Sequence, residues 1–284
     1  MRPRPAFPVL AWPLLLLLAA CDRPTGGSRP AAAPAVPADS EIPSGPLGAS
    51  IRRGLALVTA TRESLPGNVG SGLRCVSCHL DEGRRSPASW VGVVGRYPQY
   101  RSRSGSVETI EYRVNGCFER SLNGKAIAAD GPDMRDIVSY LAFLSRGVPV
   151  GYQPPPADSR WNALKPDTAA GSAFFQTNCA RCHGVDGGGT VAAPPLWGPR
   201  SFNIGAGMSR ARTAAAFIVA NMPFDKAITL TDQQALDVAG YITAQRRPDF
   251  PGKASDWPNG DAPPDVAYPT HPAHSAPPAS RAHP

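Results

Sequence analysis

Two short motifs carry the residues with the clearest chemistry in this sequence. Each has two cysteines separated by two residues and followed at once by a histidine, at residues 75–79 and 179–183. Thiols at this spacing reach two vinyl groups on one porphyrin edge, and the histidine then lies beneath the iron. The sequence therefore predicts two covalently attached haem c groups, bound through Cys75, Cys78, Cys179 and Cys182, with His79 and His183 as proximal iron ligands.

Disulfides, a redox dithiol and zinc are the other common uses of such cysteines. The chain has six cysteines and five histidines. Outside the motifs the histidines are His271, His274 and His283, all in a proline-rich tail that offers poor zinc geometry. Two complete motifs that both end in histidine favour haem over paired disulfides. The shortage of histidines also means that the distal ligands are sulfur, or that a distal site is open.

Met222 is the expected distal ligand of the second haem. It lies in Asn-Met-Pro, 39 residues after His183, which is how many class I cytochromes present a thioether. Met208 is a weaker substitute, and a methionine that only packs in the core is the alternative. We also expect the carbonyl of Pro195 to accept a hydrogen bond from the His183 ring and fix its orientation.

Cys117 occupies the matching position in the first half of the chain. It lies 38 residues after His79, so the repeat places a thiol where a distal ligand belongs. Met134 is the competing sulfur, but it falls inside a predicted helix, where its side chain would pack. A buried cysteine is often only a small hydrophobe. The spacing nevertheless favours Cys117 as a ligand of haem 1 or as a reactive thiol.

The segments around the two motifs share one layout, which indicates a duplicated unit. An apolar stretch precedes each motif, at 51–58 and 169–175, and an amphipathic stretch follows, at 134–144 and 235–242. Apolar residues recur there every three or four positions, which predicts helices with one buried face, the last capped at Thr231. Sustained strand alternation is absent from the sequence. We expect an all-α fold of two class I cytochrome c-like domains in tandem, each with one covalently bound haem c.

Composition sets the expected boundaries. A basic start, an apolar run too short to span a bilayer and the ending Leu-Ala-Ala-Cys predict a lipoprotein signal peptide over 1–20, with Cys21 as the acylated first residue. Ordinary cleavage that leaves Cys21 as a thiol is the alternative. We expect a periplasmic protein anchored to a membrane by its lipid. The remaining expected parts are a tether at 21–48, an N-terminal haem domain at 49–150, a linker at 151–168, a C-terminal haem domain at 169–250 and a disordered tail at 251–284.

Arginines are concentrated between the first motif and the region of Cys117. The formal net charge of +7 falls once a basic leader is removed and four haem propionates are counted, so it does not indicate a nucleic-acid partner. Arginines near a thiol lower its pKa and offer paired donors to an oxyanion, and a small sulfur oxyanion suits this chemistry. The cluster comprises Arg84, Arg85, Arg96, Arg101, Arg103, Arg113 and Arg120.

The residues around Cys117 form a specific pattern. It is Arg-x-x-x-Cys-x-x-Arg-Ser-x-Asn-Gly, from Arg113 to Gly124. This pattern resembles the signature of dihaem, tetrathionate-forming thiosulfate dehydrogenases, and the resemblance extends over about residues 50–250. The resemblance implies that two thiosulfate molecules are joined to tetrathionate at a His/Cys-ligated haem and that two electrons leave through a His/Met-ligated haem.

The resemblance also implies roles for individual residues. Cys117 would ligate haem 1 and take part in the chemistry, Arg103 and Arg113 would hold the anion, and Ser121 would lie within hydrogen-bonding reach of it. Arg120 is a weaker candidate, because it can instead bind a propionate.

Haem 2 would pass electrons to a soluble or membrane cytochrome. Some members of the family carry a lysine beside the distal methionine, but Asn221 stands here, which argues against a change of ligand.

Three other functions fit parts of the pattern. A non-catalytic dihaem electron-transfer cytochrome would have two saturated haems and no use for Cys117. A tetrathionate reductase would run the reverse reaction with the same residues, and only relative potentials separate the two directions. A dihaem peroxidase needs a well-placed distal histidine, which the sequence does not offer.

Overall fold

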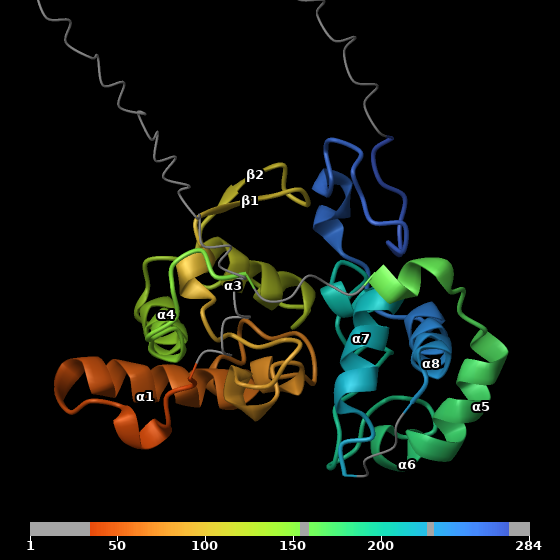
Figure 1. Ribbon diagram of the computed structural model, residues 1–284, viewed down its shortest axis with the longest axis horizontal. Helices are drawn as coiled ribbons and strands as arrows, with labels where there is room; N and C mark the ends of the chain where they lie inside the picture. The colour runs from red at the N-terminus through yellow and green to blue at the C-terminus, as the bar shows by residue number, and fades with distance from the viewer. Residues whose placement is uncertain (1–34, 154–158, 226–229, 273–284) are drawn as a thin grey trace, which may run out of the picture. The chain divides into compact units, whose positions relative to one another are not determined.

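Two pairs of crossing helices form the framework of the protein (Figure 1). The computed structural model describes residues 35–153, 159–225 and 230–272, all of which belong to the compact unit Pro34–Pro284. The framework consists of α1 (Gly45–Thr59) packed on α4 (Pro132–Leu144) and α5 (Thr168–Asn178) packed on α8 (Asp232–Ala244). These are the four helices that the hydrophobic spacing predicts.

Glycines allow both helix pairs to pack closely. A Cβ on Gly54 in α1 would lie 2.0 Å from the backbone oxygen of Asp136 in α4. A Cβ on Gly171 in α5 would lie 2.0 Å from the backbone oxygen of Asp237 in α8. Neither position has room for a side chain, so both crossings bring backbone against backbone.

The rest of the described chain forms further helices and one hairpin. Two of them, α3 and α7, lie where the sequence pattern indicates only long loops, and Thr109 caps α3 by accepting a hydrogen bond from Tyr112 N. The remaining α-helices are α2 (Thr61–Ser64), α3 (Ile110–Arg120), α6 (Ala180–His183) and α7 (Ala211–Asn221), with 3₁₀ helices η1 (Asp39–Glu41), η2 (Cys75–Ser77), η3 (Asp81–Gly83), η4 (Val94–Arg96), η5 (Ser159–Ala163), η6 (Gly207–Ser209) and η7 (Pro251–Ser255).

One hairpin interrupts the otherwise helical fold. Strands β1 (Gln99–Arg101) and β2 (Ser106–Glu108) pair antiparallel, with Tyr100 opposite Val107. Three-residue strands are too short to show alternation in the sequence, which is why the expectation of an all-α fold missed them. The turn between the strands carries Arg103.

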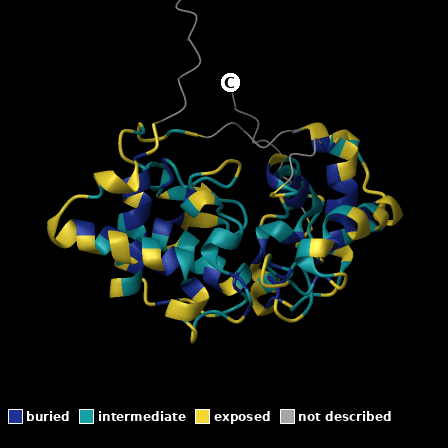
Figure 2. Cartoon of the chain, turned by 90° about the horizontal axis from the view of Figure 1, so that it is seen from below, coloured by how far each residue is buried: buried dark blue, intermediate teal, exposed yellow. Residues whose placement is uncertain are grey.

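Two hydrophobic cores lie inside the unit, and dark residues mark them in Figure 2. The first contains Phe118 and Tyr140, and the second contains Phe175 and Leu236. Phe202 and Ala206, although they follow the second motif, are buried in the first core, and Met208 packs against both cores. The segment 202–208 therefore joins the two halves.

The N-terminal domain begins before residue 49. Asp39 pairs with Arg84, and Glu41 pairs with Arg146 at 2.9 Å, so part of the predicted tether belongs to the folded domain. The signal peptide over 1–20, Cys21 and the tether up to residue 34 lie outside the described residues. Within the described ranges no helix is both long and apolar enough to cross a membrane.

The predicted linker and tail are also more ordered in structure than their composition indicates. Trp161, inside the predicted linker 151–168, is 4% exposed and belongs to the second core. Asp256, Trp257 and Tyr268 are buried, so the prediction of a disordered tail is wrong for residues 251–272. Residues 273–284 lie outside the described part of the chain. A few buried side chains in a proline-rich segment are enough to hold it in place, which overall composition does not reveal.

Candidate functional site

The first motif places its histidine against a backbone carbonyl and an indole. His79 Nδ1 lies 2.6 Å from the carbonyl oxygen of Ala88, and its ring stacks on Trp90 with centroids 4.4 Å apart. A ring nitrogen that donates to a carbonyl leaves Nε2 with a lone pair for a metal. Burial raises the pKa of the Cys75 thiol and of the Cys78 thiol to about 12.

The second motif has the same arrangement, but the carbonyl that contacts its histidine belongs to the residue before the expected one. His183 Nδ1 lies 2.9 Å from the carbonyl oxygen of Pro194, so the expected contact with Pro195 is wrong by one residue. The carbonyl of Pro195 instead accepts from Ser201 Oγ. Burial lowers the pKa of His183, which favours the neutral imidazole, and burial raises the pKa of Cys179 to about 11.

Cys117 lies in α3, one helical turn after Arg113. Arg113 Nη1 donates to Cys117 Sγ at 3.0 Å. Burial raises the pKa of this thiol, but the charge of Arg113 and a hydrogen bond from His79 outweigh burial and bring the pKa down to about 6. The surroundings of Cys117 therefore favour its thiolate form, and its sulfur lies within hydrogen-bonding reach of the histidine of the first motif.

The donor groups around the first motif fit a haem c with sulfur on its distal side. None of the five cysteines of the described residues, Cys75, Cys78 and Cys117 among them, forms a disulfide, so their sulfurs are available for haem attachment or iron ligation. The charge on Cys117 contributes to the raised pKa of both Cys75 and Cys78, so these three sulfurs lie close together. With a haem attached here, His79 would offer an imidazole nitrogen and Cys117 a thiolate to its iron.

The methionines occupy different surroundings. Met134 is 1% exposed in the first core, as expected for a packing residue. Met222 immediately follows α7 and is half-buried against the second core, a setting that fits a thioether offered to the second haem. Its neighbour Asn221 is buried and donates to Phe217 O of its own helix at 3.1 Å.

An arginine-lined cavity of about 120 Å³ borders α3, where Arg113 and Gly116 line it and the neighbouring Cys117 does not. Its lining includes all three residues that the resemblance assigns to substrate binding, Arg103, Arg113 and Ser121. The sequence-based reasoning gave no role to Arg101, and it missed Arg210, which comes from the second half of the chain. The complete lining is Arg101, Arg103, Ser104, Glu108, Tyr112, Arg113, Gly116, Glu119, Arg120, Ser121, Gly207 and Arg210.

Two of these arginines have contrasting partners. Arg103 donates to Gly205 O at 2.5 Å and lies over the Trp257 ring at 4.5 Å, and burial lowers its pKa to about 10. Arg120 instead forms a two-point ion pair with Asp256, both hydrogen bonds being 2.7 Å long. A haem propionate, the alternative partner of Arg120, would therefore compete with the carboxylate of Asp256.

Ser121 is the C-cap of α3, and Arg210 lies just before α7. The backbone N–H of Ser121 donates to Cys117 O at 2.9 Å, so the serine is fixed one turn beyond the thiolate. The Nε of Arg210 is buried and has no hydrogen-bond partner among the described residues.

Comparison with known proteins places the chain in a family. The description "SoxA/TsdA, cytochrome c domain" matches residues 68–150, and "Cytochrome c" matches residues 168–245. The thiosulfate dehydrogenase of Allochromatium vinosum is 43% identical over 271 residues, which are 90% of this chain and 98% of that protein. The chain belongs to the thiosulfate dehydrogenase family. The member from Psychrobacter arcticus is 44% identical over 240 residues, or 81% and 73% of the two chains.

A solved structure of this family supports the fold assignment. The thiosulfate dehydrogenase TsdBA from Marichromatium purpuratum, in its as-isolated form, superposes with a TM-score of 0.68 at 38% identity. The match covers 76% of this chain and spans half of that chain. The two tandem cytochrome c domains predicted from the sequence are confirmed, and with them two covalent haem c groups as cofactors.

Proposed function

We propose that this protein oxidises two thiosulfate anions to tetrathionate beside haem 1 and passes two electrons through haem 2 to an external cytochrome. The observation that carries the proposal is the contact between Arg113 and Cys117 at the edge of the arginine cavity. Arg113 thus contacts the sulfur of Cys117 and also lines a cavity in which other arginines can hold an anion.

The two ligand sets differ in what they can do. Around haem 1, the proposed attachment is through Cys75 and Cys78, with His79 and Cys117 as iron ligands. Around haem 2, Cys179 and Cys182 attach the group, with His183 and Met222 as ligands. When bound, the two haems accept the two electrons that the reaction releases.

The chemical step uses the sulfur of Cys117. Its thiolate forms an S–S bond with the sulfane sulfur of one thiosulfate, which releases two electrons and leaves a cysteine S-thiosulfonate. The second thiosulfate attacks this adduct, forms tetrathionate and returns the thiolate. A thiolate that is already deprotonated needs no general base for either step.

The arginines screen the repulsion between the reacting anions. Arg113 touches the thiolate, and Arg103 has a guanidinium in the same cavity whose hydrogen-bond and ring partners carry no negative charge. Fixed cations in a poorly solvated cavity stabilise developing negative charge strongly. Ser121, at the end of α3, is positioned to donate to a sulfonate oxygen.

The proposed location is the periplasm, with the chain anchored to a membrane through a lipid on Cys21. The support is the sequence of the leader alone. Mass spectrometry of the mature N-terminus tests this part, because an acylated Cys21 adds the mass of its lipid, and Cys21→Ser should move the protein from the membrane to the soluble fraction.

Thiosulfate-dependent reduction of ferricyanide, with tetrathionate quantified, tests the catalytic proposal. We expect the wild type to form tetrathionate and Cys117→Gly to lose about 10³-fold or more in kcat. Both haems should remain attached in the variant, since the four attachment thiols are unchanged, while the spectrum of haem 1 should shift. Met208→Leu replaces another sulfur and is the matched control, with near wild-type activity.

The outcomes separate the competing functions. If the wild type does not react with thiosulfate while both haems are redox-active, the protein is an electron carrier. If Cys117→Gly retains activity, the thiolate is not the reacting group. Potentials of the two haems, measured against the thiosulfate–tetrathionate couple, decide whether reduction of tetrathionate is the favoured direction.

A further inference from the structure

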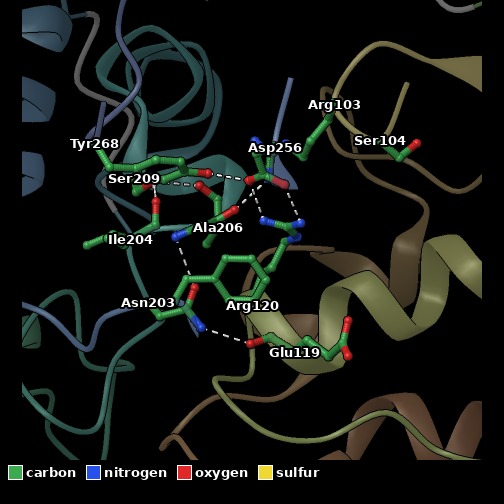
Figure 3. Close-up of polar contacts among 12 residues, drawn as sticks. Arg103, Ser104, Glu119, Arg120, Asn203, Ile204, Ala206, Ser209, Asp256 and Tyr268 are labelled. Atoms are coloured by element: carbon green, nitrogen blue, oxygen red, sulfur yellow. Dashed lines mark hydrogen bonds and ion pairs between the residues drawn. The ribbon is translucent and has the colours of Figure 1, made fainter. Parts of the chain in front are cut away.

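The C-terminal segment, defined here as residues 249–268, contacts the arginine cavity that borders α3. Asp256 accepts hydrogen bonds from both terminal nitrogens of Arg120 at 2.7 Å, and the Tyr268 hydroxyl donates to the same carboxylate (Figure 3). The Asp256 side chain is 3% exposed. Arg120 also lies over the Phe250 ring at 4.0 Å. This network fixes the C-terminal segment to the end of α3.

Trp257, the next residue, contacts Arg103 twice. Its backbone N–H donates to Arg103 O at 2.7 Å, and the Arg103 guanidinium lies over its ring at 4.5 Å. Trp257 is 3% exposed and has a φ of 52°, a left-handed conformation that bulky residues rarely adopt. Such a conformation persists only where the surrounding contacts determine it, and it is common near functional sites.

The two arginines consequently differ in charge balance. The charge of Arg120 is balanced by Asp256. Arg103 is held by an uncharged carbonyl, Gly205 O, and an uncharged ring. The carboxylate of Glu108 also lines the cavity, but it accepts from Ser104 Oγ at 2.7 Å. The charge of Asp256 also acts on Arg103, but both oxygens of that carboxylate accept from Arg120, so Arg103 has no ion-pair partner among the described residues and can bind an anion in the cavity.

We propose that Trp257 is a positioning residue, which holds the guanidinium of Arg103 toward the substrate, and that the Asp256–Arg120 pair anchors the segment carrying it. This inference rests on the proposed oxidation of thiosulfate. It means that the C-terminal segment, which follows both haem motifs in sequence, affects catalysis.

Substitution of the ring tests the proposal in the full-length dihaem protein. Trp257→Leu keeps apolar bulk but removes the flat face beneath Arg103, and we expect kcat/KM for thiosulfate to fall about 10- to 100-fold. Trp257→Phe restores a face and should recover most of the activity. Asn259→Ala removes a contact between the same segment and Tyr100 and should behave as wild type.

A double-mutant cycle separates positioning from general stability. In an Arg103→Lys background, which keeps the charge but loses the planar group, Trp257→Leu should reduce kcat/KM by no more than about 2-fold further. Haem content and melting temperature are measured for every variant. If Trp257→Leu does not fold, Tyr268→Phe replaces it in the cycle, since this variant removes one hydroxyl from the anchor. We expect it to lower kcat/KM about 3-fold in the wild-type background and to have little further effect in the Arg103→Lys background.

Each result has one meaning. Equal losses from Trp257→Leu in both backgrounds would overturn the positioning role, as would wild-type kcat/KM in Trp257→Leu. If Trp257→Leu lowers kcat/KM in the wild-type background but not in the Arg103→Lys background, the positioning role is supported. A wild-type protein that forms no tetrathionate shows instead that the proposed function, on which the inference rests, has failed.

Discussion

The two halves of the chain support their histidines in the same way. In each motif Nδ1 meets a carbonyl that follows in the loop, Ala88 O for His79 and Pro194 O for His183. In each half a tryptophan stands edge-on to a tyrosine of the last helix. These pairs are Trp90 with Tyr140, centroids 6.4 Å apart, and Trp197 with Tyr241, centroids 5.7 Å apart.

The distal sides of the two halves are different. In the first half α3 carries Cys117 beside Arg113 and borders the arginine cavity. In the second half α7, also 11 residues long, ends at Asn221 and is followed by Met222 against an apolar core. The comparison shows that two halves with the same histidine supports differ mainly on the helix that faces the proposed distal side, which presents a cysteine and arginines in one half and is followed by a methionine in the other.

Disturbing either of the two helix crossings should destabilise the protein to a similar extent. Gly54→Ala and Gly171→Ala each place a methyl group 2.0 Å from a backbone oxygen, and we expect each to cost about 3 kcal/mol or more in the free energy of unfolding. Chemical denaturation of the holoprotein measures this loss. Gly67→Ala, which meets nothing within 4 Å, is the control. A large loss at only one crossing would contradict their equivalence.

The arginine beside Cys117 should matter only to the first half. Arg113→Gln removes the donor at 3.0 Å from Cys117 Sγ, and we expect kcat/KM for thiosulfate to fall about 100-fold while the spectrum of haem 2 is unchanged. Arg113→Lys should recover part of the activity, because it restores charge without the paired donors. Arg85→Gln, an exposed arginine of the same half, is the control. Unchanged activity in Arg113→Gln would show that the cavity does not bind the substrate.

Loss of the thioether should affect the second half alone. We expect Met222→Gly to lower the potential of haem 2 by roughly 0.1 V or more and to slow electron delivery to a cytochrome acceptor about 10-fold. The KM for thiosulfate should stay near its wild-type value, because the cavity is unchanged. Redox titration followed by absorbance measures the first effect. A potential equal to that of the wild type would mean that Met222 does not bind the iron.

The smallest expected effect concerns an ion pair beside the first motif. Arg74 donates to Glu63 at 2.8 and 2.5 Å, and these bonds lower the pKa of Glu63 from 4.5 to about 2. Because the folded pKa is depressed, the pair stabilises the fold fully above about pH 4.5, and this contribution is lost as the pH falls toward 2. The pair is exposed and screened, so Glu63→Gln should cost less than about 1 kcal/mol at pH 7.

Denaturation of wild type and Glu63→Gln between pH 7 and pH 3 checks this prediction. The difference in the free energy of unfolding should shrink as the pH decreases. A difference that grows at low pH would contradict the assigned direction of the pKa shift.

Local sequence signals predicted the framework well. The four long helices have apolar residues at helical spacing, and Thr231 caps α8 with Gln234 completing a capping box. The motif spacing alone predicted both haem attachments. Cys117 could be proposed as a distal ligand because the duplication supplied a second copy in which the distance from the histidine to a candidate ligand could be compared.

Long-range contacts were beyond such signals. Asp256 meets Arg120 across 136 residues of sequence, and no local pattern reports a partner so distant. Arg210 lines the cavity because the preceding segment, 202–208, packs in the first core. The sequence alone does not show that this segment belongs to the core of the other half. The error at Pro195 has a simpler cause, since either of two successive proline carbonyls satisfies the same spacing.

The buried C-terminal segment also bears on the order in which the protein is made. Both cysteine motifs lie on the amino-terminal side of Asp256 and Trp257, which are synthesised after either motif. A chain that has just exposed its attachment cysteines therefore still lacks the Asp256 carboxylate that balances Arg120. The arginine cavity therefore lacks its contacts from Asp256 and Trp257 until the C-terminal segment has been made and has packed against Arg120 and Arg103.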